Sequence, residues 1–333
     1  MSSPPPVSRV PLADGHADSL LWNRDLAARH RRGHVDFPRL REAGVRLQCF
    51  TVVTRGYPLL DGVGALGAVR GWPRAARRGP WARCRFQLDR MEAACAASGG
   101  AVAVAGTAAA LEEHLAAGRI AAVLGIEGGQ ALEGRAERVR ELRRRGVAFL
   151  SLTHLANNEL GGSSTPLMGN RPLTPLGAEV LDEMAAAGMA LDLAHASPRT
   201  FADALAQGRA RPFCSHTGVA GATPGWRNLD DAALRALAER GGVVGIIFGT
   251  IYLGGRRLED VVRHVEHALR VAGEDAVGFG SDFDGLVPLP RGMRDVTDVP
   301  RLVDALARRQ PERVVEKVAW LNWRRFFGEA LGR

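Results

Sequence analysis

Val123-Leu124-Gly125-Ile126-Glu127 is an apolar run that ends in a carboxylate. Its length and composition predict a buried β-strand, and a carboxylate there is expensive to bury unless it is paired or bound to a metal ion. Five further segments share this design, namely residues 13–18, 149–154, 190–195, 212–216 and 277–282, which end at Asp18, His154, His195, His216 and Asp282. Six such strands are what a parallel β/α barrel needs in order to gather a metal site at one rim.

Strand-like runs alternate with amphipathic helical stretches along the chain. The predicted strands lie near residues 11–16, 45–53, 120–127, 147–154, 189–195, 211–216, 243–248 and 276–282. The predicted helices include residues 133–145, 175–187, 230–240, 258–271 and 299–309. Apolar strands separated by helices indicate βαβ units and a parallel sheet buried on both faces. The fold class is therefore α/β, and eight such units favour a (β/α)8 TIM-type barrel over an open sheet.

No linker, repeat or break in composition divides the 333 residues, so residues 1–333 are interpreted as a single catalytic barrel domain. The segment of about 54–90 interrupts the regular alternation and is rich in Gly, Pro, Arg and Trp. Connections of that length are usually functional or mobile. Since it follows the second strand, this long loop is a candidate lid over the barrel mouth.

Composition narrows the class of protein. Hydrophobic residues make up 46% and charged residues 24%, and no apolar run approaches the length of a membrane span, so no membrane association is expected. The net charge of +8 is spread along the chain, with Lys317 as the only lysine, so no nucleic-acid partner is expected either. The N-terminus is polar and Pro-rich, and the four cysteines lack paired or metal-binding spacing. A reduced, cytoplasmic protein is expected.

His16-x-Asp18 places two side chains on one face of a strand, because side chains alternate with period two. Imidazole nitrogen and carboxylate oxygen are both good zinc ligands. A buried His–Asp pair is the structural alternative, but His195 and His216 on later strands favour a metal site. A carboxylated lysine cannot bridge two metals here, so Glu127 is the candidate bridge; its alternative role is a salt bridge to an arginine.

Among the remaining histidines and motifs, one is a candidate for the site and the others are not. His154 ends its strand as a further ligand, an oxyanion stabiliser or a core histidine. The helical spacing of His264 and His267 predicts two solvated side chains. The run Gly62-Val63-Gly64-Ala65-Leu66-Gly67 matches the dinucleotide-binding fingerprint. It lies outside any predicted βαβ unit, so it is not interpreted as a dinucleotide site.

Together these segments resemble the membrane (renal) dipeptidase family of binuclear zinc peptidases. The matching pieces, in family order, are Asp14-Gly15-His16-x-Asp18, Glu127-Gly128-Gly129, Leu152-Thr153-His154, Asn157-Asn158, Leu191-Asp192-Leu193-x-His195-x-Ser197, Ser215-His216, Arg227-Asn228-Leu229 and Gly280-Ser281-Asp282-Phe283-Asp284-Gly285. The ordered set is far more specific than any one piece. It implies a metallo-dependent hydrolase-like barrel.

The resemblance implies two Zn²⁺ per chain, bridged by Glu127 and a water or hydroxide. The metal ligands would be His16, Asp18, Glu127, His195 and His216. His154 would contact the scissile carbonyl oxygen and Arg227 the substrate carboxylate, and Asp282 would transfer the proton. Two departures from the family pattern, Ala17-Asp18-Ser19-Leu20-Leu21 and Gly225-Trp226, affect the pocket wall and hence substrate preference.

The implied function is zinc-dependent hydrolysis of dipeptides, with tolerance for a D-residue at the second position, and the family implies a homodimer. A related binuclear metal hydrolase acting on a cyclic amide, a lactone or an N-acyl amino acid is the nearest alternative, since such substrates can also carry a carboxylate. A metal-free binding protein that kept the fold and a basic nucleic-acid binder are alternatives of other classes. Failure to bind zinc would favour the former, and steeply salt-dependent binding to DNA or RNA the latter.

Overall fold

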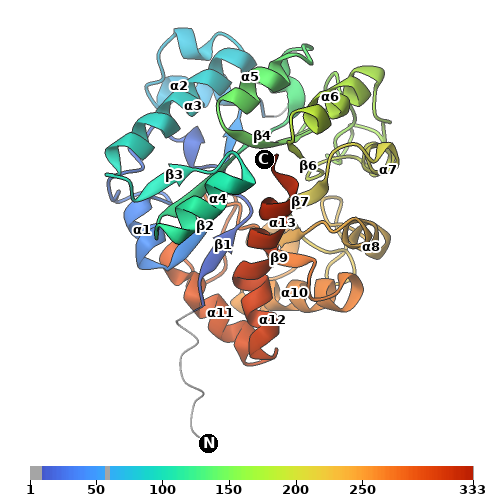
Figure 1. The fold of residues 1–333 in the computed structure, drawn as a ribbon. Helices are drawn as coiled ribbons and strands as arrows, with labels where there is room; N and C mark the ends of the chain where they lie inside the picture. Colours follow the sequence, from blue (N-terminus) through green and yellow to red (C-terminus); the bar gives the residue numbers. More distant parts are fainter. Residues whose placement is uncertain (1–9, 57–60, 333) are drawn as a thin grey trace, which may run out of the picture.

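The computed structural model describes residues 10–56 and 61–332, and within them parallel strands form the centre of the molecule (Figure 1). The strands are β1 (Leu12–Asp14), β2 (Val45–Val53), β3 (Val102–Val104), β4 (Ile120–Glu127), β5 (Val147–Ser151), β6 (Ala190–Asp192), β7 (Pro212–Thr217), β8 (Val244–Ile246) and β9 (Val277–Phe279). Every pair of neighbours is parallel, in the order β1-β2-β4-β5-β6-β7-β8-β9.

The first and last strands of this order also meet, which makes the sheet a nearly closed barrel. The backbone N–H of Gly15 donates to the carbonyl of Phe279 over 2.8 Å, and a parallel bridge joins Ala17 to Phe283. The predicted α/β class and eight-stranded TIM-type barrel are therefore confirmed.

The predicted strands differ from the observed ones mainly at their ends. Predicted strands 189–195 and 276–282 end earlier, at Asp192 and Phe279. His195 and Asp282 have positive φ angles of 65° and 59°, so the chain leaves the extended conformation before it reaches them. The short strand β3, which pairs with β4, was not predicted because three residues carry too little periodicity.

Helices cover the outside of the barrel (Figure 1). They are α1 (Phe37–Glu42), α2 (Gly62–Val69), α3 (Pro80–Ala97), α4 (Ala108–Ala116), α5 (Arg138–Arg144), α6 (Pro175–Ala186), α7 (Pro198–Gln207), α8 (Asp231–Glu239), α9 (Thr250–Leu253), α10 (Leu258–Ala272), α11 (Val299–Ala307), α12 (Glu312–Glu316) and α13 (Asn322–Ala330). Short turns η1 (Ser19–Leu21), η2 (Ala75–Arg77), η3 (Gly129–Leu132), η4 (Val296–Asp298) and the π-helical η5 (Lys317–Leu321) join them. Within the described ranges no helix is both long and apolar enough to cross a membrane.

Local sequence explains where several of these helices begin. The side chains of Thr174 and Ser197 accept hydrogen bonds from backbone N–H groups of the first turns of α6 and α7. Each is followed by a proline, whose missing N–H costs nothing at the first helical position. The start of α6 agrees with the predicted helix 175–187, whereas α7 was not among the helices predicted.

The segment 54–90 is not the long irregular loop that its composition predicted. It contains η2, all of α2 and the first part of α3. Asp61 caps α2, and its carboxylate also pairs with the buried Arg83 of α3. Residues 57–60 of the segment lie outside the described residues. Three residues of α2, Gly62, Val63 and Leu66, line the cavity at the barrel mouth. That this segment acts as a lid over the cavity stays a prediction, but the segment is helical and not an irregular loop.

Trp323 of α13 fills the barrel interior near the starts of the strands. Its indole N–H donates to the carbonyl of Phe279 over 2.8 Å, and its ring stacks on Phe327. A Cβ atom at Gly15 would lie 2.3 Å from this ring, so only glycine fits there. The side chain closes one end of the barrel and leaves the other, where the strands end, for the polar residues described next.

Candidate binuclear metal centre

The polar side chains that follow the barrel strands converge around one cavity of about 590 Å³. Its walls include Asp18, Glu127, His154, His195, His216 and Asp282. Three overlapping groups of potential metal ligands lie there, with their ligand atoms within 4.8 Å of one another: His16, Glu127 and His216; Glu127, His154 and His195; and His16, Asp18 and Asp282. The structure thus brings together every residue predicted to bind metal.

Glu127 is at the centre of this group. Its Oε1 atom lies 3.0 Å from Nε2 of His195, and 3.6 Å from Nε2 of His16 and of His216. Glu127 and the three histidines are all at most 5% exposed. One carboxylate oxygen surrounded by three imidazoles that reach it from three different strands has the arrangement expected of a bridging ligand.

Asp18 completes one side of the centre. Its Oδ1 atom lies 3.4 Å from Nε2 of His16 and accepts a hydrogen bond of 2.6 Å from Thr51. Oδ1 of Asp282 lies 4.0 Å from the same imidazole nitrogen, and the Asp282 N–H donates to the His16 carbonyl over 3.2 Å. Asp282 therefore faces the centre from the strand that closes the barrel.

The hydrogen bonds behind the centre determine which imidazole nitrogens face it. Nδ1 of His216 lies 2.9 Å from Oγ of Ser215, and Nδ1 of His16 lies 3.2 Å from the same oxygen. The Ser215 hydroxyl donates to Asp192, a carboxylate that can only accept. Ser215 must therefore accept from both rings, which leaves Nε2 of the neutral His216 ring as a lone pair and turns Nε2 of both rings toward Glu127. This arrangement suits metal coordination.

Two further carboxylates shape the strand ends without touching the centre. Asp192 also accepts from Ser151 and from the Ser215 N–H, and Asp14 accepts from Ser281 and Gln48. Both aspartates are at most 7% exposed. Both residues are part of the sequence motifs, but the motifs did not indicate a role for them. Residue type alone does not distinguish an aspartate that accepts hydrogen bonds from one that binds a metal ion.

Burial dominates the titration of the site. It raises the pKa of Glu127 well above its ordinary value, with the nearby Asp18 adding to the effect, and it lowers the pKa of His195 and His216 well below theirs. Burial also lowers the pKa of His16, but Glu127 and Asp18 outweigh it and raise that pKa to about 10. An acid that resists ionisation beside imidazoles that resist protonation is a group that a cation would stabilise.

A metal pair fits this donor set. Oε2 of Glu127 is buried without a hydrogen-bond partner in the described part of the chain. Such orphaned atoms are rare in folded proteins. The nitrogen and oxygen ligands are those that zinc prefers.

His154 lies at the same rim. Its Nε2 is 3.7 Å from Oε2 of Glu127, and its Nδ1 is 3.0 Å from the carbonyl of Arg55. A carbonyl only accepts, so Nδ1 carries the proton and Nε2 of the neutral ring is a lone pair. Burial lowers the pKa of His154 to about 4. The predicted contact with a carbonyl oxygen therefore requires the ring to gain a second proton or to release Arg55.

Arg227 lies beside the centre. It is 3% exposed, and Nη2 donates to the carbonyl of His216 over 2.8 Å. Its Nε atom is buried with no partner among the described residues. Arg227 lines an adjoining cavity of about 330 Å³ that shares His195 and Trp226 with the catalytic cavity. An anionic group held there would lie next to the metal ligands.

The family model for membrane dipeptidase (peptidase family M19) matches residues 7–331. The chain belongs to the membrane dipeptidase family. It is 30% identical over 323 residues to the dipeptidase aclJ of Aspergillus oryzae, a match that covers 91% of this chain and 74% of that protein.

Solved structures of metallopeptidases extend the likeness to the fold. A metallopeptidase from Rhodobacter sphaeroides, crystallised with a phosphinate mimic of the dipeptide L-Ala-D-Ala, is 26% identical and has a TM-score of 0.81 over 97% of this chain and 99% of that one. Another M19 metallopeptidase, dipeptidase AC, is 25% identical, with a TM-score of 0.80 over the same shares. The resemblance drawn from the sequence motifs is therefore confirmed.

One prediction about a histidine was wrong. His264 is fully buried in this membrane dipeptidase, where its Nδ1 accepts from the N–H of Val219 over 3.0 Å. Its partner in the pattern, His267, is half-buried and lies 2.6 Å from Asp231. Helical spacing shows which residues share a face, but not that another loop covers that face.

Proposed function

We propose that this membrane dipeptidase hydrolyses dipeptides with two zinc ions held in the barrel mouth. The enzyme class, a metallo-dipeptidase, follows from family membership. In the proposal His16 and Asp18 hold one ion, His195 and His216 hold the other, and Glu127 bridges them. The observation that carries it is the convergence of three imidazole Nε2 atoms on Glu127 Oε1 within 3.6 Å, beside a buried arginine.

The zinc pair, when bound, supplies a water of lowered pKa near neutral pH and polarises the substrate carbonyl. Asp282 faces the same space and acts as proton carrier: it accepts the proton released by that water and passes it to the departing amine. In the metal-free protein burial, with Asp18 nearby, raises the pKa of Asp282 to about 7. His154, which lies beside Glu127, contacts the carbonyl oxygen once its ring gains a second proton or releases Arg55.

Arg227 selects the substrate in this proposal. Its guanidinium binds the C-terminal carboxylate of the dipeptide, and its unpartnered Nε supports a charge-assisted hydrogen bond there. The separation between this arginine and the metal ligands limits the substrate to two residues. It constrains the carboxylate and the scissile bond but not the side chain between them, so a D-residue is tolerated at the second position. The complex of a family relative with an L-Ala-D-Ala mimic supports this tolerance.

A hydrolysis panel tests the proposed function. The zinc-loaded protein is assayed with L,L and L,D dipeptides, the matching dipeptide amides, lactams, a lactone and N-acyl amino acids. Dipeptides with free carboxylates should be cleaved at least tenfold faster, in kcat/KM, than all other classes. Preference for a lactam, lactone or N-acyl amino acid would show that the binuclear site serves a different hydrolase reaction.

We also propose that the protein is cytoplasmic, acts without a membrane or nucleic acid, and forms a homodimer. The cytoplasmic proposal is supported by four free cysteines, three of them buried. Size-exclusion chromatography with light scattering tests the dimer, and a monomer at micromolar concentration would contradict it.

A further inference from the structure

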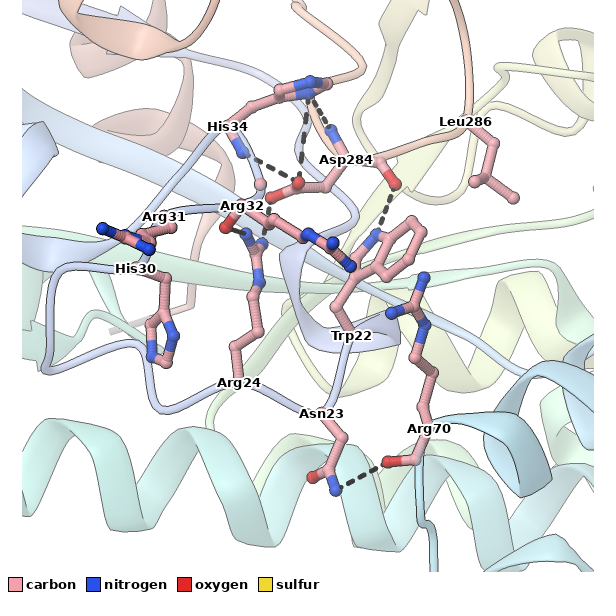
Figure 2. Close-up of a pocket in the computed structure, with 11 residues that line it drawn as sticks. Trp22, Asn23, Arg24, His30, Arg31, Arg32, His34, Arg70, Asp284 and Leu286 are labelled. Carbon is pink, nitrogen blue, oxygen red and sulfur yellow. Dashed lines mark hydrogen bonds and ion pairs between the residues drawn. The ribbon is translucent and has the colours of Figure 1, made fainter.

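A second cavity of about 590 Å³ is lined in part by Asp284 and Leu286, from the same segment as Asp282 (Figure 2). Four arginines line it, Arg24, Arg31, Arg32 and Arg70, while Asp284 is the only carboxylate among its described lining residues. The proposed mechanism uses none of these arginines. The cavity therefore has a strong excess of positive charge that needs an explanation of its own.

Asp284 does not neutralise this excess. Its carboxylate is 2% exposed and already accepts hydrogen bonds from Arg24 over 2.5 Å, from Ser19 over 2.7 Å and from the N–H of His34 over 2.9 Å. Arg32 and Arg70 have no carboxylate within ion-pair distance among the described residues. Arg31 has none either, but it points away from the cavity's aromatic ring (Figure 2), which leaves the guanidinium groups of Arg32 and Arg70 available there.

These two groups approach the same aromatic side chain. Figure 2 shows the guanidinium groups of Arg32 and Arg70 directed toward Trp22, whereas Arg31 points away from it. The Arg70 guanidinium carbon lies 4.3 Å from the centre of the Trp22 ring. The indole N–H donates to the Asp284 carbonyl over 2.7 Å, which holds the ring in place. A rigid aromatic surface with flanking guanidinium groups suits an organic anion.

We propose that this cavity binds a phosphate monoester carrying a small apolar group. Arg32 and Arg70 would hold the phosphate, because two guanidinium groups match its charge of about −2 and its three acceptor oxygens. A single carboxylate would leave one arginine unpaired. The organic group would lie against Trp22 and Leu286, of which Leu286 is 68% exposed.

The position of Leu286 links the cavity to catalysis. It lines both this cavity and the catalytic one. Asp282, Asp284 and Leu286 have φ angles of 59°, 67° and 66°, so three alternate residues of one segment are left-handed. Such backbone persists only where the surroundings hold it. A ligand against Leu286 should therefore change the KM for dipeptides; this step rests on the proposed function, but the binding itself does not.

Calorimetric titration of the zinc-loaded protein with phenyl phosphate tests the site. Inorganic phosphate and phenol serve as probes for the two parts of the ligand. Arg32→Gln and Arg70→Gln should each weaken phenyl phosphate binding about fivefold or more, since each removes a charge-assisted hydrogen bond of about 1 kcal/mol or more. Arg31→Gln is the matched control, because it removes the same charge from the next residue and should change the dissociation constant less than twofold.

The double variant separates this site from the metal centre, which can also bind phosphate. Binding that survives in Arg32→Gln/Arg70→Gln occurs elsewhere, and if all of it survives the proposal is wrong. Equal weakening by Arg31→Gln would show that phenyl phosphate binds through the general positive charge of the region and not at a defined site. If phenyl phosphate binds no better than inorganic phosphate, the proposed apolar contact with Trp22 and Leu286 is wrong. If the protein does not hydrolyse dipeptides at all, the calorimetric titration still tests whether this cavity binds phenyl phosphate.

Discussion

Nε2 of His195 and Nε2 of His216 lie 3.0 Å apart. The second of these carries no proton, since Ser215 fixes its ring with Nδ1–H as the donor. In the metal-free protein His195 can donate its Nε2–H to this nitrogen, and both nitrogens lie at the position proposed for one zinc ion. We therefore expect close to two zinc ions per chain by elemental analysis, and the loss of at least one in Glu127→Gln. Glu133→Gln at the surface is the control, and one zinc or none in the unchanged protein would exclude a bridged pair.

Asp192 and Ser215 are expected to tune metal affinity without contacting metal. Ser215→Ala removes the acceptor that orients His16 and His216, so the zinc dissociation constant should rise about 10–100-fold. Competition with a chromophoric chelator measures it. Ser151→Ala is a matched control, because this hydroxyl also donates to Asp192 but touches no imidazole. Equal effects of the two changes on the zinc dissociation constant would mean that Ser215 does not act by orienting the imidazoles.

Arg227→Met should raise KM for dipeptides roughly 100-fold, since it leaves a substrate carboxylate unpaired in a buried place. KM for the corresponding dipeptide amides should change far less, because they carry no charge for the arginine to pair with. Steady-state kinetics on both substrate series give the answer. If dipeptide and amide KM rise together, Arg227 serves the structure of the pocket and not carboxylate recognition.

Asp282→Asn keeps the size of the side chain but removes its ability to accept and return a proton. We expect kcat to fall about 10²–10⁴-fold, while zinc content stays at the wild-type value because the five proposed metal ligands are unchanged. Kinetics and metal analysis on the same preparation check both parts. Turnover close to wild type with full metal would assign proton transfer to another group.

His264 should make the stability of the fold depend on pH. Burial lowers its pKa from 6.5 to about 4. As the pH falls below about 6.5 the unfolded chain takes up the proton first, so the stabilisation present at neutral pH is lost progressively down to about pH 4. The full loss is about 3 kcal/mol, at ~1.4 kcal/mol for each tenfold change in proton affinity.

Urea unfolding of the metal-free protein at pH 7.5 and pH 5 measures this effect, compared with His264→Gln. The variant should be the less stable protein at pH 7.5, with a smaller difference at pH 5. A difference that is constant between the two pH values would mean that folding does not lower the pKa of His264.

The order of strands and the chemistry at their ends could be predicted from sequence. Apolar runs such as Val123–Ile126 can be recognised as strands, because a strand buried on both faces consists almost entirely of hydrophobic residues. The helical content of residues 62–97 was missed, since glycines and prolines there suggest turns. Asp61 and Arg83 stabilise these helices through a contact 22 residues apart, which no local pattern reveals.

The chain alone determined that histidines and acids would collect at one end of a barrel, because strand periodicity and the residue after each strand are local properties. Only tertiary structure decided that Glu127 Oε1 would meet three imidazoles, that Ser215 would orient two of them, and that His264 would be covered by another loop. Those outcomes depend on distances across the closed barrel and on hydrogen bonds between residues up to 199 positions apart. Such distances are set by how all the strands and helices pack together, and no single segment encodes them.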